Sequence, residues 1–174
     1  MNKKDTVVFD LDGTLLDTLE DLKNSVNYAM TQCGYPEHTL DEVRRYVGNG
    51  ILLLMQRAIP GGKDDPNFDK AFTLFKEHYG KHCNDTTKPY AGIMELLRTL
   101  KENNIKIAIV SNKADFAVKE LNAIYFKDLI PVAIGEKESE GIRKKPAPDT
   151  VIEALKQLGS TAENSVYIGD SDVD

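Results

Sequence analysis

The sequence is short of cysteine and has no long apolar run. Its 174 residues include two cysteines, Cys33 and Cys83, whose spacing indicates neither a disulfide framework nor a redox motif. No stretch approaches the roughly 18 apolar residues of a membrane span, and the N-terminus MNKKDTVVF lacks the apolar segment of a signal peptide. We therefore expect a cytoplasmic protein without a membrane partner.

Excess basic charge is absent as well. The formal net charge is −6, and residues of both signs are spread along the chain. Because the basic footprint of nucleic-acid-binding proteins is missing, we expect no nucleic-acid partner. The length suffices for one hydrophobic core, or for one core with a small appended domain.

The sequence does have two distinct hydrophobic patterns. Short runs rich in β-branched residues predict buried strands at residues 6–9, 105–110, 131–134 and 165–168. Between residues 17 and 85 the apolar residues instead recur at helical spacing, without a strand pattern. Helical patterns also separate the later strands, which is typical of a parallel α/β sheet. We predict a Rossmann-like core, residues 1–16 and 86–174, with an all-helical domain, residues 17–85, inserted after the first strand.

Polar residues directly follow three of the predicted strands. Asp10 follows the first strand, Ser111 and Asn112 follow the second, and Gly169 and Asp170 follow the last. In open parallel sheets, ligands bind at the carboxyl ends of the strands. We therefore expect these residues to converge on one crevice.

The first strand runs into two carboxylates, Asp10 and Asp12. At an intermediate effective dielectric, such a pair repels by about 4 kcal/mol. The pair is tolerated where water solvates it, as in a turn after an edge strand, or where it shares a cation or a proton. The other motifs decide between these alternatives.

Four motifs in this order, FDLDGTLLDT, VSNK, KKPAPD and YIGDSDVD, resemble those of the haloacid dehalogenase-like superfamily of phosphotransferases. The resemblance covers the chain from Val7 onward. Thr14 and the VGNG at residues 47–50 resemble the phosphoglycolate phosphatases of that superfamily. The resemblance implies that residues 17–85 are a helical cap, which in that subgroup closes over the site and excludes water.

The resemblance also implies the catalytic roles. Asp10 would be the nucleophile that forms an aspartyl-phosphate, and Asp12 the general acid and then the general base. Lys145 would supply positive charge to the phosphoryl group. The cofactor would be Mg²⁺, bound by Asp10, the backbone carbonyl of Asp12, and Asp170, with Asp174 in or just beyond the metal shell.

Further residues would bind the phosphoryl group. The predicted contacts are Gly13, where the backbone turns close to the phosphate, Thr14, the Ser111 hydroxyl and the backbone amide of Asn112. Lys113, next in the chain, is expected to be an exposed residue at the start of a helix.

In the cap, Gly48, Asn49 and Gly50 could form a substrate-sensing turn, although a plain turn between helices explains them nearly as well. Arg45 or Arg57 could pair with a substrate carboxylate.

Simpler explanations exist for several of these residues. Ser111 could be no more than a cap for the next helix, without a role in phosphate binding. Lys145 lies in a charged run beside Lys144, and such runs usually face solvent, but the Pro-x-Pro-Asp that follows favours a catalytic role. His78 and His82 have a spacing that can bind zinc on a helix, yet an exposed helix end explains them better.

The implied activity is Mg²⁺-dependent hydrolysis of a small phosphorylated metabolite, with 2-phosphoglycolate first among the candidates, by a monomer or weak dimer. Alternatives are a sugar-phosphate mutase of the same superfamily and an inactive phosphate- or metal-binding module. The chain stops at Asp174, directly after the fourth motif, where relatives continue with a helix, a strand and a further helix. We therefore expect the C-terminal part of the core to be missing and one face near residues 165–168 to be uncovered.

Overall fold

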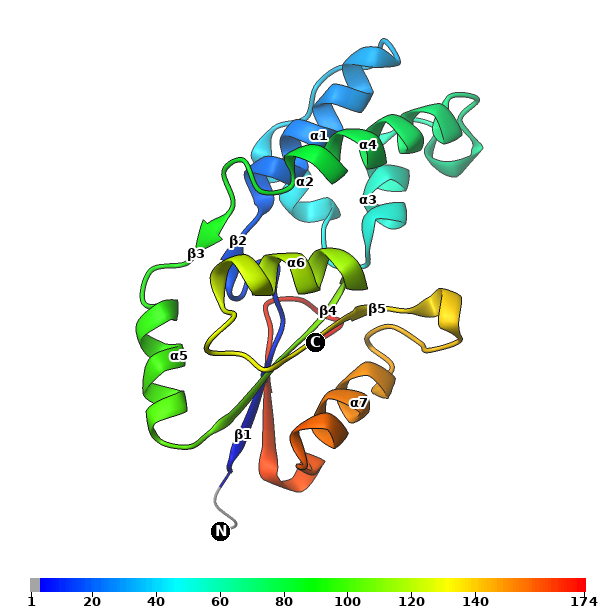
Figure 1. Ribbon diagram of the computed structural model, residues 1–174. Coiled ribbons are helices and arrows are strands. Elements are labelled where there is room, and N and C mark those ends of the chain that lie inside the picture. The colour runs from blue at the N-terminus through cyan, green and yellow to red at the C-terminus, as the bar shows by residue number, and fades with distance from the viewer. Residues whose placement is uncertain (1–3) are drawn as a thin grey trace. The chain divides into compact units, whose positions relative to one another are not determined.

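The computed structural model describes residues 4–174, and its central element is a four-stranded parallel sheet (Figure 1). The strand order is β5–β4–β1–β6, and each strand runs parallel to its neighbours. The strands are β1 (Thr6–Phe9), β4 (Lys106–Ala114), β5 (Val132–Glu136) and β6 (Ser165–Ile168). The predicted parallel α/β fold is thus confirmed, and β4 continues four residues beyond its predicted end.

Helices cover both faces of this sheet (Figure 1). They are α5 (Ile93–Glu102), α6 (Asp115–Tyr125) and α7 (Asp149–Leu158), with 3₁₀ turns at Glu138–Glu140 and Ala162–Asn164. Successive residues of a strand point to opposite faces. Accordingly, Ile107 and Ile109 pack in the same apolar cluster as α5 and α6, whereas Ala108 and Val110 pack with α7. The unbroken apolar run of β4 therefore serves two separate cores.

The sheet and its helices form one compact unit, which comprises the residues up to Leu16 and Pro89–Asp174. The second unit is Asp17–Lys88, so its C-terminal boundary lies three residues beyond the expected one. Both boundaries fall within two-residue strands that pair with each other, β2 (Leu16–Asp17) and β3 (Lys88–Pro89). Neither strand was predicted, because two residues are too few to show a periodicity.

The second unit is helical and has its own core. Its helices are α1 (Leu19–Gln32), α2 (Leu40–Tyr46), α3 (Ile51–Ala58) and α4 (Phe68–His82), with a 3₁₀ turn at Gly62–Asp64. Side chains at helical spacing, among them Val26 and Met30 of α1 and Phe75 of α4, are fully buried there. Within residues 4–174, no helix is both long enough and apolar enough to cross a membrane.

At the β6 edge of the sheet, two apolar side chains remain accessible. Val166 is 40% exposed and Ile168 is 41% exposed. The expectation of an uncovered face near residues 165–168 is therefore confirmed.

One buried carboxylate ties the two ends of the helical unit together. Asp21 of α1 is 1% exposed and accepts hydrogen bonds from the backbone N–H groups and the hydroxyls of Thr86 and Thr87, at 2.7–3.1 Å. Burial raises the pKa of Asp21, but these hydrogen bonds outweigh it and leave the pKa below its ordinary value. The ionised carboxylate therefore stabilises the fold.

We expect Asp21→Asn to lower the free energy of unfolding by at least roughly 2 kcal/mol, because an amide cannot accept all of these bonds and hydrogen bonds to charged groups are the stronger ones. Since the folded pKa is depressed, the contribution of Asp21 is fully present above the ordinary pKa and is lost as the pH falls from there through the lower folded pKa. Urea unfolding at pH 7 and pH 3 checks both statements, and the difference between wild type and Asp21→Asn should be smaller at pH 3. Glu77→Gln, on the exposed side of α4, is the control. Equal unfolding midpoints for wild type and Asp21→Asn at pH 7 would contradict the prediction.

Candidate active site

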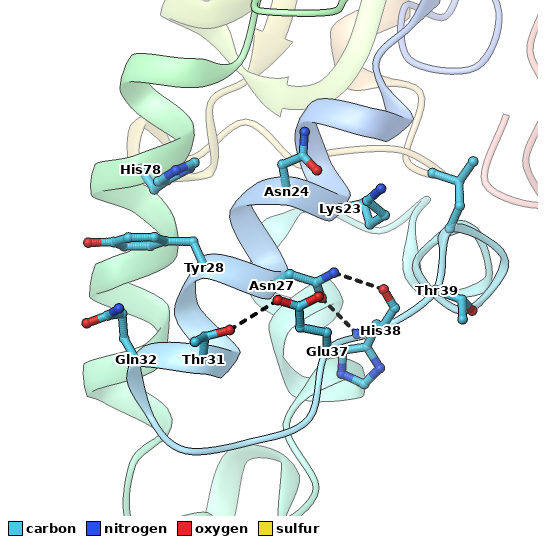
Figure 2. A pocket seen from close by; sticks show the side chains of 11 residues that line it. Lys23, Asn24, Asn27, Tyr28, Thr31, Gln32, Glu37, His38, Thr39 and His78 are labelled. Carbon is cyan, nitrogen blue, oxygen red and sulfur yellow. Dashed lines mark hydrogen bonds between the residues drawn. The ribbon is translucent and has the colours of Figure 1, made fainter.

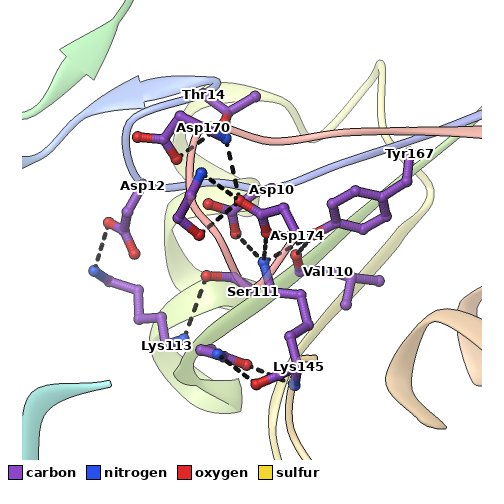
Figure 3. A network of polar contacts seen from close by, with 12 residues as sticks. Asp10, Asp12, Thr14, Val110, Ser111, Lys113, Lys145, Tyr167, Asp170 and Asp174 are labelled. Atoms are coloured by element: carbon purple, nitrogen blue, oxygen red, sulfur yellow. Dashed lines mark hydrogen bonds and ion pairs between the residues drawn. The ribbon is translucent and has the colours of Figure 1, made fainter. Parts of the chain in front are cut away.

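The carboxyl ends of three strands bring the predicted residues together in one unit (Figure 3). The site collects Asp10 and Asp12 from the segment after β1, Ser111 from β4, and Asp170 from the segment after β6. The segment between β5 and α7 adds Lys145. Residues more than a hundred positions apart in the chain thus meet at one edge of the sheet.

The loop after β1 is fixed by buried leucines and by its own hydrogen bonds. Leu11, Leu15 and Leu16 are fully buried, and the Leu15 N–H donates to the Leu11 carbonyl at 3.0 Å. Gly13 lies between them with φ +83°, where a side chain is strained. A Cβ there would also overlap the carboxylate of Asp170. Gly13 therefore allows two acidic segments to approach each other.

Lys145 is the centre of the polar network in Figure 3. Its Nζ donates to Asp10 Oδ1 at 2.8 Å, to the Tyr167 hydroxyl at 2.8 Å, and to Asp174 Oδ1. An ammonium group has three N–H donors, so these acceptors use all of them. Lys144 instead pairs with Glu138 at 3.1 Å. The structure therefore places Lys145, and not its neighbour, in the site.

The end of β4 holds the backbone of Lys145. The Asn112 side chain donates to the Lys145 carbonyl at 3.1 Å and accepts from the Lys145 N–H at 2.9 Å. The suggestion that Ser111 caps the next helix is wrong, because the N-cap of α6 is Ala114. Ser111 is 3% exposed, and its hydroxyl accepts from the Lys113 N–H at 3.3 Å. Phosphate binding by Ser111 and by the Asn112 amide stays a prediction.

The prediction for Lys113 is wrong. We expected an exposed residue at a helix start, but Lys113 is 8% exposed and its Nζ lies 2.8 Å from Asp12 Oδ1. The reason is that β4 continues through Ala114, so that Lys113 still belongs to the strand and its side chain reaches the site.

Tyr167 of β6 was not identified from the sequence. Its hydroxyl accepts from Lys145 and donates to the Val110 carbonyl at 2.9 Å. Burial, together with the charges of Asp10 and Asp174, raises its pKa above the ordinary value, so the hydroxyl stays neutral. A tyrosine one residue before the end of a short strand carries no signal that would separate it from core residues.

Three carboxylates form a group that fits a hard divalent cation. Oxygen atoms of Asp10, Asp170 and Asp174 all lie within 4.8 Å of one another, and carboxylate oxygens are the ligands that Mg²⁺ prefers. Thr14 lies beside them, with its hydroxyl 3.5 Å from Asp170 Oδ1. Among residues 4–174 this is the one group of three or more side chains arranged to hold a metal ion.

The pKa values of these acids differ with their surroundings. Burial raises the pKa of Asp10 to about 6, although the charge of Lys145 opposes it. Burial and the nearby charge of Asp174 also raise the pKa of Asp170. Burial acts on Asp174 as well, but hydrogen bonds from Lys145 and Ser171 leave its pKa below the ordinary value. Asp10 is thus the acid whose ionisation most needs a nearby cation.

The candidates in the helical unit stay predictions. Gly48 and Gly50 have φ values of 126° and 85°, and Gly50 begins α3, which is consistent with a tight turn. Asn49 lies between them. Arg57 donates to the Tyr46 carbonyl at 2.9 Å.

The histidines of α4 pair with neighbouring side chains. His78 Nδ1 lies 3.0 Å from the Ser25 hydroxyl, and His82 Nδ1 lies 2.7 Å from Asp85. They are not part of the aspartate group described above.

The helical unit also carries a polar groove of about 530 Å³, lined by α1, residues 37–40 and His78 (Figure 2). The Asn27 side chain exchanges two hydrogen bonds with the backbone of His38, at 2.8 and 2.9 Å, and Thr31 donates to Glu37 at 3.4 Å. These hydrogen bonds join α1 to residues 37–40 along the groove.

Comparisons with known proteins support the resemblance. A sequence model of the family described as haloacid dehalogenase-like hydrolase matches residues 7–174. The phosphoglycolate phosphatase of Pseudomonas putida is 32% identical over 171 residues, which are 95% of this chain and 62% of that protein. That of Aquifex aeolicus is 33% identical over 172 residues, 97% of this chain and 76% of that protein. A crystal structure from Lactobacillus delbrueckii subsp. bulgaricus is 34% identical with a TM-score of 0.89, covering 99% of this chain and 80% of that one.

We expect Asp10→Asn to stabilise the metal-free protein. The folded pKa of about 6 lies above the ordinary 3.8, so the cost of ionised Asp10 is absent below the ordinary pKa, grows as the pH rises between the two values, and is complete above 6. At pH 8 in EDTA the variant should gain up to about 3 kcal/mol, at about 1.4 kcal/mol for each pKa unit. Thermal unfolding at pH 8 and pH 4 measures this, with the exposed Asp128→Asn as control. A Tm of Asp10→Asn below that of the wild type at pH 8 would contradict the prediction. It would show that the attraction of Lys145 for ionised Asp10 exceeds the cost of burying that charge.

We expect Tyr167→Phe to lower the free energy of unfolding by about 1–3 kcal/mol, because Lys145 loses an acceptor and the buried Val110 carbonyl loses a donor. Urea unfolding measures the change. Tyr28→Phe, at a tyrosine 40% exposed in the helical unit, is the matched control and should shift stability by less than about 0.5 kcal/mol. Equal effects of the two substitutions would contradict a structural role for the Tyr167 hydroxyl.

Proposed function

The chain belongs to the haloacid dehalogenase-like hydrolases, and on this basis we propose that it hydrolyses a small phosphate monoester, with 2-phosphoglycolate as the leading substrate. The observation that carries the proposal is the placement of Asp10, buried at the end of β1, ion-paired with Lys145 at 2.8 Å and grouped with Asp170 and Asp174. The relatives named phosphoglycolate phosphatases support the choice of substrate. Since the chain spans 62% of the Pseudomonas putida protein, the activity of the whole protein is part of the proposal.

In the proposed reaction, a carboxylate oxygen of Asp10 attacks phosphorus, and the bond to the leaving oxygen breaks as an aspartyl-phosphate forms. Asp12 donates its proton to the leaving oxygen, so that an alcohol departs. Water then attacks phosphorus while the ionised Asp12 takes up the proton of the water. The bond between phosphorus and the Asp10 oxygen breaks, which releases phosphate and restores both acids.

Lys145 orients the nucleophile and supplies positive charge. Its Nζ holds one oxygen of Asp10, and the charge lies where negative charge grows on the phosphoryl oxygens. Because Asp174 and Tyr167 occupy its other two N–H groups, an arriving phosphoryl oxygen must share or replace one acceptor. Asn112 keeps the lysine backbone in place during this exchange.

The carboxylates of Asp10, Asp170 and Asp174, with the backbone carbonyl of Asp12, would hold Mg²⁺, which when bound neutralises the acids and polarises the phosphoryl group. The charge count fits a divalent ion. Four carboxylates surround two ammonium groups, those of Lys113 and Lys145, which leaves two negative charges when all are ionised.

The test is phosphate release from 2-phosphoglycolate and from a panel of sugar and nucleoside monophosphates, with and without Mg²⁺. We expect the wild-type chain to release phosphate from at least one substrate only when Mg²⁺ is present. Asp10→Asn should lower the rate by at least about three orders of magnitude, as loss of a nucleophile does in other enzymes. Asp128→Asn should match the wild type.

Two other outcomes would replace the proposal. Conversion of a sugar phosphate to an isomer without free phosphate would identify a mutase. Binding of Mg²⁺ or phosphate by the folded chain without turnover of any substrate would identify a binding module.

A further inference from the structure

We infer that Lys113 is a positioning residue that orients the carboxylate of Asp12 for proton transfer to the leaving group. The inference rests on the proposed phosphatase function and adds a residue to its machinery. Lys113 Nζ lies 2.8 Å from Asp12 Oδ1, and the two side chains are only 5% and 16% exposed. This second lysine–aspartate pair is formed beside that of Lys145 and Asp10 (Figure 3).

A bulge in β4 gives Lys113 its place. Val110 pairs with Ile134 and Ala114 pairs with Glu136, so that four steps along β4 match two steps along β5. Bulges of this kind change the direction of a side chain and often lie next to active sites. Residues 111–113 therefore lie opposite a single residue of β5, Gly135, which is two residues more than regular pairing would place there.

The backbone at the bulge is tightly held. The Lys113 N–H donates to the Ser111 hydroxyl at 3.3 Å, and the Gly135 N–H donates to Asp115 at 2.9 Å. A Cβ on Gly135 would overlap the backbone of Lys113 and Asp115. The lysine therefore projects from a fixed base, which a positioning role requires.

Stability alone does not explain this pair. Removing an ammonium group and a carboxylate from water costs several kcal/mol for each ion, and replacing such a pair by apolar residues is often neutral or stabilising. A buried lysine at this position is instead accounted for by what it does to Asp12. With Oδ1 held by Lys113, the carboxylate cannot rotate about its terminal bond without breaking the ion pair, so the position of Oδ2 is fixed as well.

Each of the two lysines thereby holds one of the two proposed catalytic carboxylates. Asn112 fixes the backbone of Lys145, which holds Asp10, and the adjacent Lys113 holds Asp12 directly. Two adjacent residues, Asn112 and Lys113, therefore set the relative position of the proposed nucleophile and the proposed acid.

Misplacing the general acid should affect substrates differently according to the basicity of their leaving group, whereas a general loss of structure should affect all substrates alike. The proton from Asp12 is needed most when the leaving oxygen is a strongly basic alkoxide and least when it is a stabilised aryl oxide such as 4-nitrophenolate. Loss of Lys113 should therefore lower kcat/KM far more for an alkyl phosphate than for 4-nitrophenyl phosphate.

The experiment compares kcat/KM for 4-nitrophenyl phosphate and for 2-phosphoglycolate, or the best alkyl phosphate of the panel, at saturating Mg²⁺. For Lys113→Met we expect a fall of about 100-fold on the alkyl substrate, the scale of general acid catalysis, and of less than about tenfold on the aryl substrate. Lys113→Arg, which keeps the positive charge, should recover part of the kcat/KM lost on the alkyl substrate. Lys156→Met, at an exposed lysine of α7, is the control and should change neither value.

A double-mutant cycle keeps the test independent of folding. Asp12→Asn should show the same preference for the aryl substrate. Adding Lys113→Met to Asp12→Asn should hardly change the ratio of the two kcat/KM values, because both substitutions act through the carboxylate of Asp12. Equal falls on both substrates, or additive effects in the double variant, would overturn the inference while the phosphatase function stands. Absence of any turnover by the wild type would overturn the proposed function, and this inference with it.

Discussion

The structure of the site depends on one electrostatic constraint, the repulsion among four carboxylates gathered at the ends of two parallel strands. Each close pair repels by about 4 kcal/mol at an intermediate dielectric, so the group could not stay together unaided. Lys145 joins Asp10 to Asp174, and Lys113 holds Asp12. Two positive charges against four negative ones reduce the repulsion without removing it. The remaining double negative charge is what a divalent cation would neutralise, which supports the proposed metal site over a closed network of ion pairs.

The backbone around the site is built to let these acids approach. Gly13 and Gly169 lie where a Cβ would overlap the carboxylates of Asp170 and Asp174, respectively. Asp174 in turn accepts from the N–H groups of Asp170 and Ser171, which folds the segment after β6 back on itself. Buried leucines on the other side of the β1 loop supply the apolar contacts that hold this arrangement. The glycines thus allow the two segments to approach, the buried leucines hold the β1 loop in place, and the lysines reduce the repulsion between the carboxylates.

Much of this was predictable from the sequence, and the exceptions share a cause. The strands at 6–9 and 165–168 and the meeting of their polar ends follow from β-branched runs and from the rule that parallel strands bind ligands at their carboxyl ends. Lys113 was assigned wrongly, because Ser-Asn-Lys after an apolar run usually marks the end of a strand, and only pairing with β5 shows that β4 bulges and continues. Pairing across the sheet likewise determines the contacts of Tyr167. Such contacts are made between distant segments, so no local pattern records them.

The charge of the site also implies an order of events for an anionic ligand. With its acids ionised and no cation present, the group of four carboxylates and two ammonium groups is net negative and repels a phosphate dianion. Burial raises the pKa of Asp10 to about 6 despite the charge of Lys145, so this network alone disfavours the ionised form of the proposed nucleophile. The same burial strengthens every attraction once the charge is balanced, because little water competes with it. In the proposed enzyme, anion binding would therefore follow neutralisation of the acids, and a bound cation would recover the stability lost in keeping Asp10 charged.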